Sequence, residues 1–160
     1  MEQANYQVNV NWKKDHRGIV SSPVLQSKID VATPPEFPGG IAGVWSPEHL
    51  LVAAVNGCLL TTFLAIAENS KFEYMNFESN ANGKLEKVDG KYMITEITLS
   101  PIVSIAEAED RERAERILQK AEAACIISNS VKSKIIFQPR VKILFPTEKP
   151  LFNLDFVPPY

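Results

Sequence analysis

The sequence predicts an α+β fold in which antiparallel sheets wrap around a buried central helix. Three observations support this prediction. A long apolar segment in the middle of the chain has helix-start signals, a second segment has apolar residues at helical spacing, and runs of alternating polarity lie before and between them. The length of 160 residues fits one domain spanning residues 1–160.

The first forty residues predict a small sheet followed by a loop. Residues 7–12 alternate between polar and apolar side chains, as a half-buried strand does. A polar turn at 13–18 leads to a second short strand at 19–21, and residues 24–31 suit a third. The stretch TPPEFPGGIAG, residues 33–43, is too rich in Pro and Gly for either regular element and is predicted to be a loop.

The central helix has a well-defined predicted start. Ser46 suits the N-cap, Pro47 the first helical position, and Glu48 the first turn. The apolar run from 50 to 67 is about long enough to cross a membrane, but polar and small residues interrupt it and charged residues bound it. These interruptions are Asn56, Gly57, Thr61 and Thr62. We therefore expect the core helix of a soluble protein, and because one chain has little sheet to cover it, a homodimer.

The second half predicts a hairpin, a helix and a strand. Strands at 74–86 and 91–103 are joined by the Asp89-Gly90 turn. Residues 106–128 form an amphipathic helix, and 134–145 form the last strand. The tail PTEKPLFNLDFVPPY has four prolines in fifteen residues, so it is no regular element, and its aromatics are expected to pack on the body of the protein or on a partner.

Composition excludes several classes of function. A net charge of −2 gives no basis for binding nucleic acid or an acidic membrane. The N-terminus lacks a secretory pattern, so the expected compartment is the cytoplasm, where cysteines are more often reduced or redox-active than structurally bridged. Phosphate-loop, GxSxG, HExxH and CxxC motifs are absent. The metal-ligating types have no close-pair spacing, so neither metal nor cofactor is expected; they are Cys58, Cys125, His16 and His49.

The two cysteines are the candidate reactive groups. A free cysteine usually packs as a small apolar side chain, and this inert role fits Cys58 and Cys125 from the residues alone. A reactive thiol, whose ordinary pKa is about 8.5, needs a cation or a helix N-terminus nearby, and Cys58 lies too deep in its helix for the latter. Arg17 or Arg140 could supply the cation, with Glu48 to orient an arginine, although an exposed turn is the commoner setting for Arg17.

The segment SPEHLLVAAVNGCLLTTF resembles the family of osmotically inducible protein C and organic hydroperoxide resistance protein. That family has Pro-Glu at the start of a central helix and a cysteine ten residues after the Glu, as in Pro47, Glu48 and Cys58. A second family cysteine follows some sixty to seventy residues later, which matches Cys125, and an arginine in the N-terminal hairpin matches Arg17.

The resemblance covers residues 8–145 and has one clear departure. Many family members place a proline directly after the second cysteine, whereas this chain has Ile126. The resemblance implies an OsmC-like fold, built as an intertwined homodimer, and a peroxidase that reduces organic hydroperoxides to alcohols without a cofactor.

The resemblance also implies a role for each site residue. The thiolate of Cys58 attacks the peroxide and becomes a sulfenic acid, Cys125 condenses with it to form a disulfide, and an external dithiol, for which a lipoyl-type dithiol is one candidate, reduces the disulfide. Arg17 stabilises the developing charge and Glu48 orients Arg17. The expected apolar lining of the substrate site is Leu51, Val55, Leu59 and Phe63.

The sequence is also compatible with two other functions, and the spacing of Glu48 and Cys58 poses a geometric problem. The chain could bind a small hydrophobic ligand with inert cysteines, or its thiol could act on another electrophile. Glu48 and Cys58 lie ten residues apart, which on one straight helix is about 15 Å along the axis. We therefore expect Glu48 of one subunit to approach Cys58 of the other in the homodimer.

Overall fold

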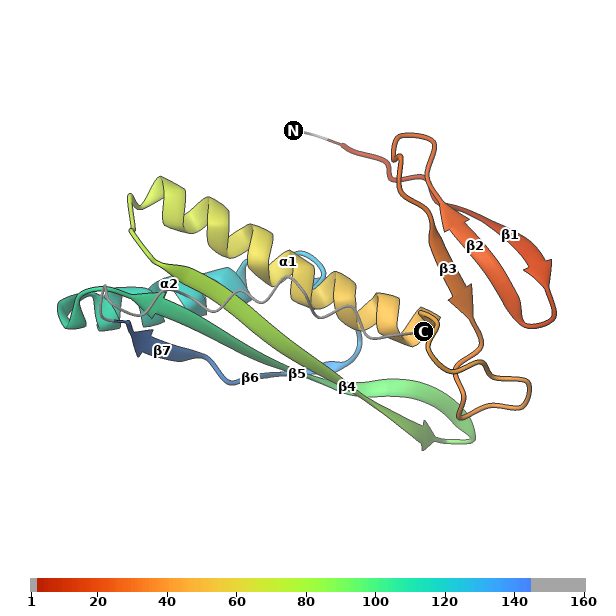
Figure 1. Ribbon diagram of the computed structural model, residues 1–160. Helices are drawn as coiled ribbons and strands as arrows, with labels where there is room; N and C mark the ends of the chain where they lie inside the picture. The colour runs from red at the N-terminus through yellow and green to blue at the C-terminus, as the bar shows by residue number, and fades with distance from the viewer. Residues whose placement is uncertain (1–2, 145–160) are drawn as a thin grey trace.

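The computed structural model describes residues 3–144 and contains two sheets and two main helices (Figure 1). In chain order the elements are β1 (Asn9–Lys14), β2 (Arg17–Ser21), β3 (Ile29–Ala32), α1 (Pro47–Asn69), β4 (Asn76–Val88), β5 (Lys91–Ile105), the 3-10 turn η1 (Ala108–Asp110), α2 (Arg111–Ala123), the 3-10 turn η2 (Ser128–Ser130), β6 (Lys134–Phe137) and β7 (Arg140–Ile143). The predicted α+β class with a central helix is confirmed.

The first sheet is antiparallel throughout, but the second is mixed. Strands β1, β2 and β3 lie in that order, and β4 and β5 form the predicted long hairpin. Strands β6 and β7 pair with β5 in parallel, because the chain crosses over through α2 before it returns to the sheet. The prediction of purely antiparallel sheets is therefore wrong for this edge of the second sheet.

The last predicted strand is split into β6 and β7, which pair with β5 in the same register. Leu99 of β5 pairs with Phe137, and Ile102 pairs with Arg140, so both pieces keep the same offset along β5. The interruption contains Pro139, which has no N–H to donate to the ladder. The tail that was expected to pack on the body or on a partner lies outside the described residues.

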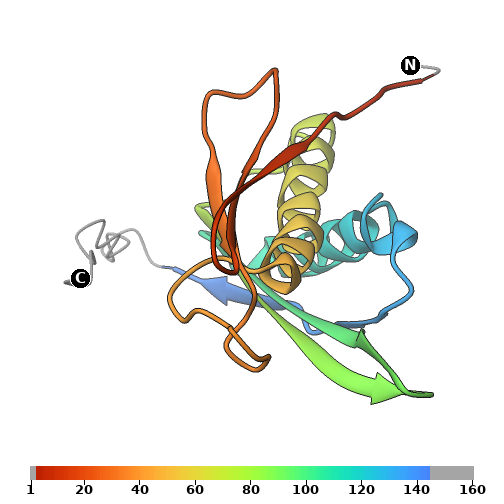
Figure 2. The same cartoon turned by 90° about the vertical axis from the view of Figure 1, so that its right-hand side faces the viewer.

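The core lies between the helices and one face of the second sheet (Figure 2). Every fourth residue of α1 points into it, which gives the fully buried row Val55, Leu59, Phe63 and Ala67. The ring of Phe63 packs against Tyr74 and Phe77 at centroid distances of 5.1 and 4.7 Å. The matching residues of α2 are Ala114, Ile117, Leu118 and Ala121.

The second helix ends earlier than its apolar spacing predicts. It runs only to Ala123, and Cys125 lies in the turn that follows rather than on the helix. The Asn129 side-chain amide donates a hydrogen bond of 3.1 Å to the carbonyl of Ala123 and thereby satisfies one of the free carbonyls at the helix end. The third predicted strand is likewise shorter, because residues 24–28 belong to the loop before β3.

A single chain does not bury α1 on all sides. The most apolar window of this helix has a mean hydropathy of 2.2, and only 22% of it is buried. The length and apolarity match those of a membrane-spanning helix, yet one face packs on α2 and β4. The first sheet projects from the body at the N-terminal end of α1 (Figures 1 and 2) and also exposes large apolar side chains. These side chains are Val10 and Trp12 on β1, together with Tyr6 and Val8 before β1 and Val24 and Leu25 in the loop between β2 and β3.

Candidate active site

Cys58 lies at the middle of α1, which is one continuous helix from Pro47 to Asn69. The Ser46 side chain caps the helix, accepting a hydrogen bond of 3.3 Å from the backbone N–H of His49, and its hydroxyl lies 2.8 Å from the imidazole Nδ1 of His49. Cys58 is partly buried at the boundary between the buried row of α1 and the uncovered face. Its thiol is therefore supported by the core on one side and accessible from the other.

The turn after α2 brings Cys125 next to Cys58. Cys125 is fully buried, and its sulfur accepts a hydrogen bond of 3.4 Å from the backbone N–H of Ser128. The same sulfur lies 4.0 Å from the carbonyl oxygen of Val55, one turn before Cys58 on α1. Both thiols are free, and each affects the pKa of the other. They form a dithiol pair made by residues 67 positions apart in sequence.

The surroundings shift the pKa values of the two thiols in opposite directions. Burial raises the pKa of Cys58, but hydrogen bonds from the backbone N–H of Ile127, the thiol of Cys125, the hydroxyl of Thr62 and the N–H of Ile126 lower it, and the net pKa lies below its ordinary value. Burial raises the pKa of Cys125 above its ordinary value. Cys58 is therefore the group that ionises first, as a nucleophile must.

Arg17 and Glu48 lie away from Cys58, at the lining of one shared cavity. Both line a cavity of about 670 Å³ between the first sheet and the N-terminal end of α1. Within residues 3–144, the Nε atom of Arg17 and the Oε2 atom of Glu48 are buried and have no hydrogen-bond partner. Cys58 does not line this cavity and lies about 15 Å along α1 from Glu48. Apolar residues around the cavity include Val10, Trp12, Val31, Ala32 and Phe37.

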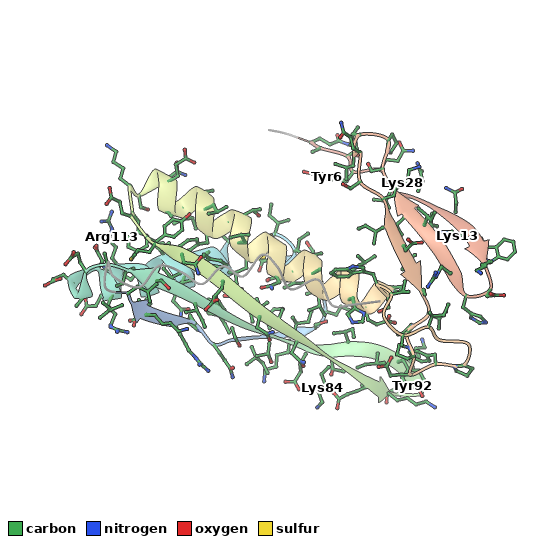
Figure 3. The ribbon with its side chains drawn as sticks, viewed as in Figure 1. Tyr6, Lys13, Lys28, Lys84, Tyr92 and Arg113 are labelled. Carbon is green, nitrogen blue, oxygen red and sulfur yellow. The ribbon has the colours of Figure 1, made fainter. Side chains whose placement is uncertain are left out.

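The 33–43 loop supports the turn just before Arg17. The N–H of Thr33 donates a hydrogen bond of 3.1 Å to the carbonyl of His16, the residue before Arg17. The His16 ring packs on Gly39, where a Cβ atom would lie only 2.5 Å from its Nε2 atom. At its outer end the loop contacts β5 through the ring of Phe37, whose centroid lies 5.3 Å from that of Tyr92. Tyr92 is labelled near the tip of the β4–β5 hairpin in Figure 3.

Three of the four residues expected to contact the substrate belong to the core instead. Val55, Leu59 and Phe63 are fully buried among β-strand and α2 side chains, and none of them lines the cavity of Arg17 and Glu48. Their spacing of four places them on the inward face of α1. Of these four residues, only Leu51 is accessible on the helix surface, where its side chain is 37% exposed.

Sequence reasoning missed the polar groups closest to the candidate nucleophile. The Thr62 hydroxyl lies 3.9 Å from the Cys58 sulfur, and its position four residues later on the same helix could have indicated this contact. The backbone amides after Cys125, which also lower the pKa of Cys58, could not be predicted from the sequence, because every residue except proline has a backbone N–H. The described residues contain no group of three side chains that could hold a metal ion.

Comparison with known proteins gives relatives of the same size. The chain is 24% identical over 143 residues to YmaD of Bacillus subtilis, an uncharacterised protein, which covers 86% of this chain and 93% of YmaD. It is 29% identical over 97 residues to the peroxiredoxin OsmC of Escherichia coli, which covers 61% of this chain and 67% of that protein.

Solved structures show the same fold at low sequence identity. An OsmC-like protein of unknown function from Vibrio cholerae matches with a TM-score of 0.75 and 23% identity over 86% of this chain and 99% of that one. An organic hydroperoxide resistance protein OsmC from Legionella pneumophila matches with a TM-score of 0.66 and 21% identity over 88% of this chain and all of that one. The family model described as OsmC-like protein matches residues 40–140, which include both cysteines and Glu48. The chain therefore belongs to the OsmC-like protein family.

Proposed function

We propose that the protein is a thiol-dependent peroxidase that reduces organic hydroperoxides in the cytoplasm. The observation that carries this proposal is the pairing of Cys58, whose pKa is lowered, with a buried Cys125 whose pKa is raised. One such thiol suits attack and the other suits resolution. Family membership and the names of the Escherichia coli and Legionella pneumophila relatives support a redox role.

The proposed reaction needs two external reactants, a hydroperoxide that oxidises Cys58 and a dithiol that reduces the resulting disulfide. The Cys58 thiolate attacks the distal peroxide oxygen, the O–O bond breaks, and the alkoxide takes a proton to leave as an alcohol, with Cys58 oxidised to a sulfenic acid. The Cys125 sulfur then displaces the sulfenic hydroxyl, which leaves as water, and a disulfide forms. An external dithiol, with the lipoyl type as one candidate, reduces this disulfide and is itself oxidised to a disulfide.

A second copy of the chain would complete the site. One chain holds Arg17 and Glu48 in a cavity away from Cys58, and the uninterrupted helix leaves no bend to bring them closer. If two α1 helices pack antiparallel, Glu48 and Arg17 of one copy approach Cys58 of the other. Arg17 would then stabilise the charge that develops on the leaving oxygen, while Glu48 orients Arg17.

Apolar surface near the thiol favours an organic peroxide over hydrogen peroxide. Leu51 and Leu60 are partly exposed on α1, and the Ile126 side chain beside the dithiol is 72% exposed. The cavity that holds Arg17 and Glu48 is also mostly apolar in lining. An alkyl group would remove this surface from water in the bound state, whereas hydrogen peroxide offers nothing to bury.

Substituting the nucleophile tests this function. Cys58→Ser should abolish consumption of an alkyl hydroperoxide in the presence of dithiol, because a serine hydroxyl is not ionised at neutral pH, while circular dichroism should show an intact fold. The wild type should consume alkyl hydroperoxide faster than hydrogen peroxide. Near-normal activity of the variant would contradict the mechanism. A wild type that consumes no peroxide would instead favour hydrophobic-ligand binding or attack on another electrophile.

A further inference from the structure

Three polar residues follow one another in η2, and two of them use their side chains to hold the turn after α2. The Asn129 side-chain amide donates to the carbonyl of Ala123 at 3.1 Å, and the exposed Ser130 hydroxyl donates to the carbonyl of Ile126 at 2.7 Å. Ser128 differs from both neighbours. Within residues 3–144 its hydroxyl oxygen is buried and has no hydrogen-bond partner, and the whole residue is only 8% exposed. A buried hydroxyl without a partner is costly, so its presence calls for an explanation.

The backbone of Ser128 bonds the resolving sulfur. Its N–H donates to the Cys125 sulfur at 3.4 Å, and the next N–H, that of Asn129, donates to the Cys125 carbonyl at 3.1 Å. The Ser128 hydroxyl is joined to this N–H through Cα and Cβ alone, so rotation about χ1 reorients it beside the sulfur. From α1, the carbonyl oxygen of Val55 lies 4.0 Å from the same sulfur. That oxygen can accept from a thiol but offers no donor to a thiolate, whereas Ser128 carries two donors.

We propose that Ser128 activates the resolving cysteine: its N–H holds the Cys125 sulfur, and its buried hydroxyl donates a hydrogen bond to that sulfur when the thiol ionises. The inference deepens the proposed function, on which the resolving role of Cys125 rests. Burial raises the pKa of the Cys125 thiol, while the side chain and the N–H of Ser128 act to lower it. A hydroxyl that is unbonded beside the thiol is available to the anion, to which a hydrogen bond is stronger.

This assignment concerns the second step of the proposed reaction. Cys125 supplies the electron pair of the new S–S bond, the S–O bond of the Cys58 sulfenic acid breaks, and the hydroxyl leaves as water with the proton that Cys125 gives up. The attacking group is a thiolate, which is the form that the Ser128 hydroxyl stabilises. The first step uses the Cys58 thiolate and the peroxide. Loss of the Ser128 hydroxyl should therefore slow disulfide formation and leave peroxide attack unchanged.

Two alanine variants in the same turn separate this chemistry from a structural role. Ser128→Ala removes the unpartnered hydroxyl and keeps the N–H, whereas Ser130→Ala removes a hydroxyl that bonds the turn. Ser130→Ala should lower the midpoint of urea unfolding and leave the rate of disulfide formation unchanged. Ser128→Ala should not lower the midpoint, because its hydroxyl makes no bond in the reduced protein.

A single turnover with one equivalent of alkyl hydroperoxide measures the two steps separately. Samples are quenched at intervals with a sulfenic-acid trap and an alkylating agent and are analysed by mass spectrometry. In Ser128→Ala the sulfenic acid on Cys58 should form at the wild-type rate and convert to the disulfide about tenfold more slowly, the effect of losing one hydrogen bond to a charged group. Disulfide formation at the wild-type rate in Ser128→Ala would overturn the proposal.

A titration without peroxide tests the same donors. The chain has two cysteines, so in Cys58→Ser the ultraviolet absorbance of the thiolate reports Cys125 alone, with the variant lacking both cysteines as the blank. Cys58 is also the titratable group that influences the pKa of Cys125, and this variant removes it. Adding Ser128→Ala should raise the pKa of Cys125 by about one pH unit, which corresponds to about tenfold less thiolate.

The N–H donor is tested in the same background. In ¹⁵N-labelled Cys58→Ser, the amide signal of Ser128 should shift with pH in step with the absorbance of the Cys125 thiolate. An unchanged pKa of Cys125 in the Ser128→Ala background, or a Ser128 amide that does not respond, would overturn the proposal. A wild type that consumes no peroxide, together with the expected pKa change, would refute the proposed function and leave the action of Ser128 on the Cys125 sulfur standing.

Discussion

The chemistry depends on an asymmetry between two cysteines that composition alone cannot distinguish. Cys58 lies at the edge of the core, where donors offset the effect of burial and lower its pKa, whereas Cys125 is fully buried and its pKa is raised. At neutral pH the thiolate fraction of Cys58 therefore exceeds that of an ordinary thiol. We expect activity to fall as the pH drops through the pKa of Cys58, not through that of Cys125.

The resolving role of Cys125 predicts a specific kinetic arrest. Cys125→Ser should consume about one equivalent of alkyl hydroperoxide and then stop, because the sulfenic acid on Cys58 has no partner thiol. Stopped consumption with mass spectrometric detection of sulfenic or higher acids on Cys58 checks this outcome. Sustained turnover of Cys125→Ser with the same dithiol would show that the reductant attacks the sulfenic acid directly.

The elements that sequence reasoning predicted best are those specified by local signals. The Ser46 cap and Pro47 start α1 where they were expected, and the Asp89-Gly90 turn closes the long hairpin. The end of α2 was misplaced because Asn129 caps it from beyond the helix, and the parallel pairing of β6 depends on a crossover that no local pattern encodes. The resemblance predicted the four site residues, which are Cys58, Cys125, Arg17 and Glu48. It did not predict that, in one chain, the two cysteines lie together while Arg17 and Glu48 lie at a separate cavity.

The 33–43 loop offers a test of how Arg17 is positioned. Gly39 and Gly43 both have positive φ, 77° and 74°, but a Cβ at Gly39 meets the His16 ring, whereas a Cβ at Gly43 meets nothing within 4 Å. Gly43→Ala should cost about 1 kcal/mol of stability for its left-handed backbone and leave peroxidase activity unchanged. Gly39→Ala should cost more and also lower kcat, because displacing His16 moves the adjacent Arg17.

Urea unfolding and steady-state kinetics of both glycine variants provide this comparison. Because the two positions share the backbone strain, their difference isolates the contact with His16. Equal stability and equal activity in Gly39→Ala and Gly43→Ala would mean that the loop does not position Arg17.

For the whole molecule, the uncovered apolar surface predicts an obligate homodimer. Only 22% of the most apolar window of α1 is buried in one chain, and the first sheet exposes an apolar face beside it. Tyr6, Lys13 and Lys28 mark this projecting sheet in Figure 3, far from Arg113 at the opposite end of the body. Such a shape buries its apolar surface when two copies wrap around each other.

Mixing two inactive variants tests whether the sites are shared between copies. Cys58→Ser and Glu48→Ala protomers, mixed in equal amounts under exchange, should recover about a quarter of wild-type activity, because half of the dimers are mixed and each has one intact site. Sites contained within one chain predict no recovery. A monomer in solution at micromolar concentration, measured by analytical ultracentrifugation, would contradict the shared site altogether.

The most direct test of the dithiol mechanism is the state of the two cysteines after limited oxidation. Reduced protein is treated with one equivalent of an alkyl hydroperoxide, the remaining thiols are alkylated, and the digest is analysed by mass spectrometry. The mechanism predicts a peptide pair joined by a disulfide between Cys58 and Cys125, with loss of both free thiols in step with peroxide consumption. Peroxide consumed while both thiols remain free to alkylate would contradict it.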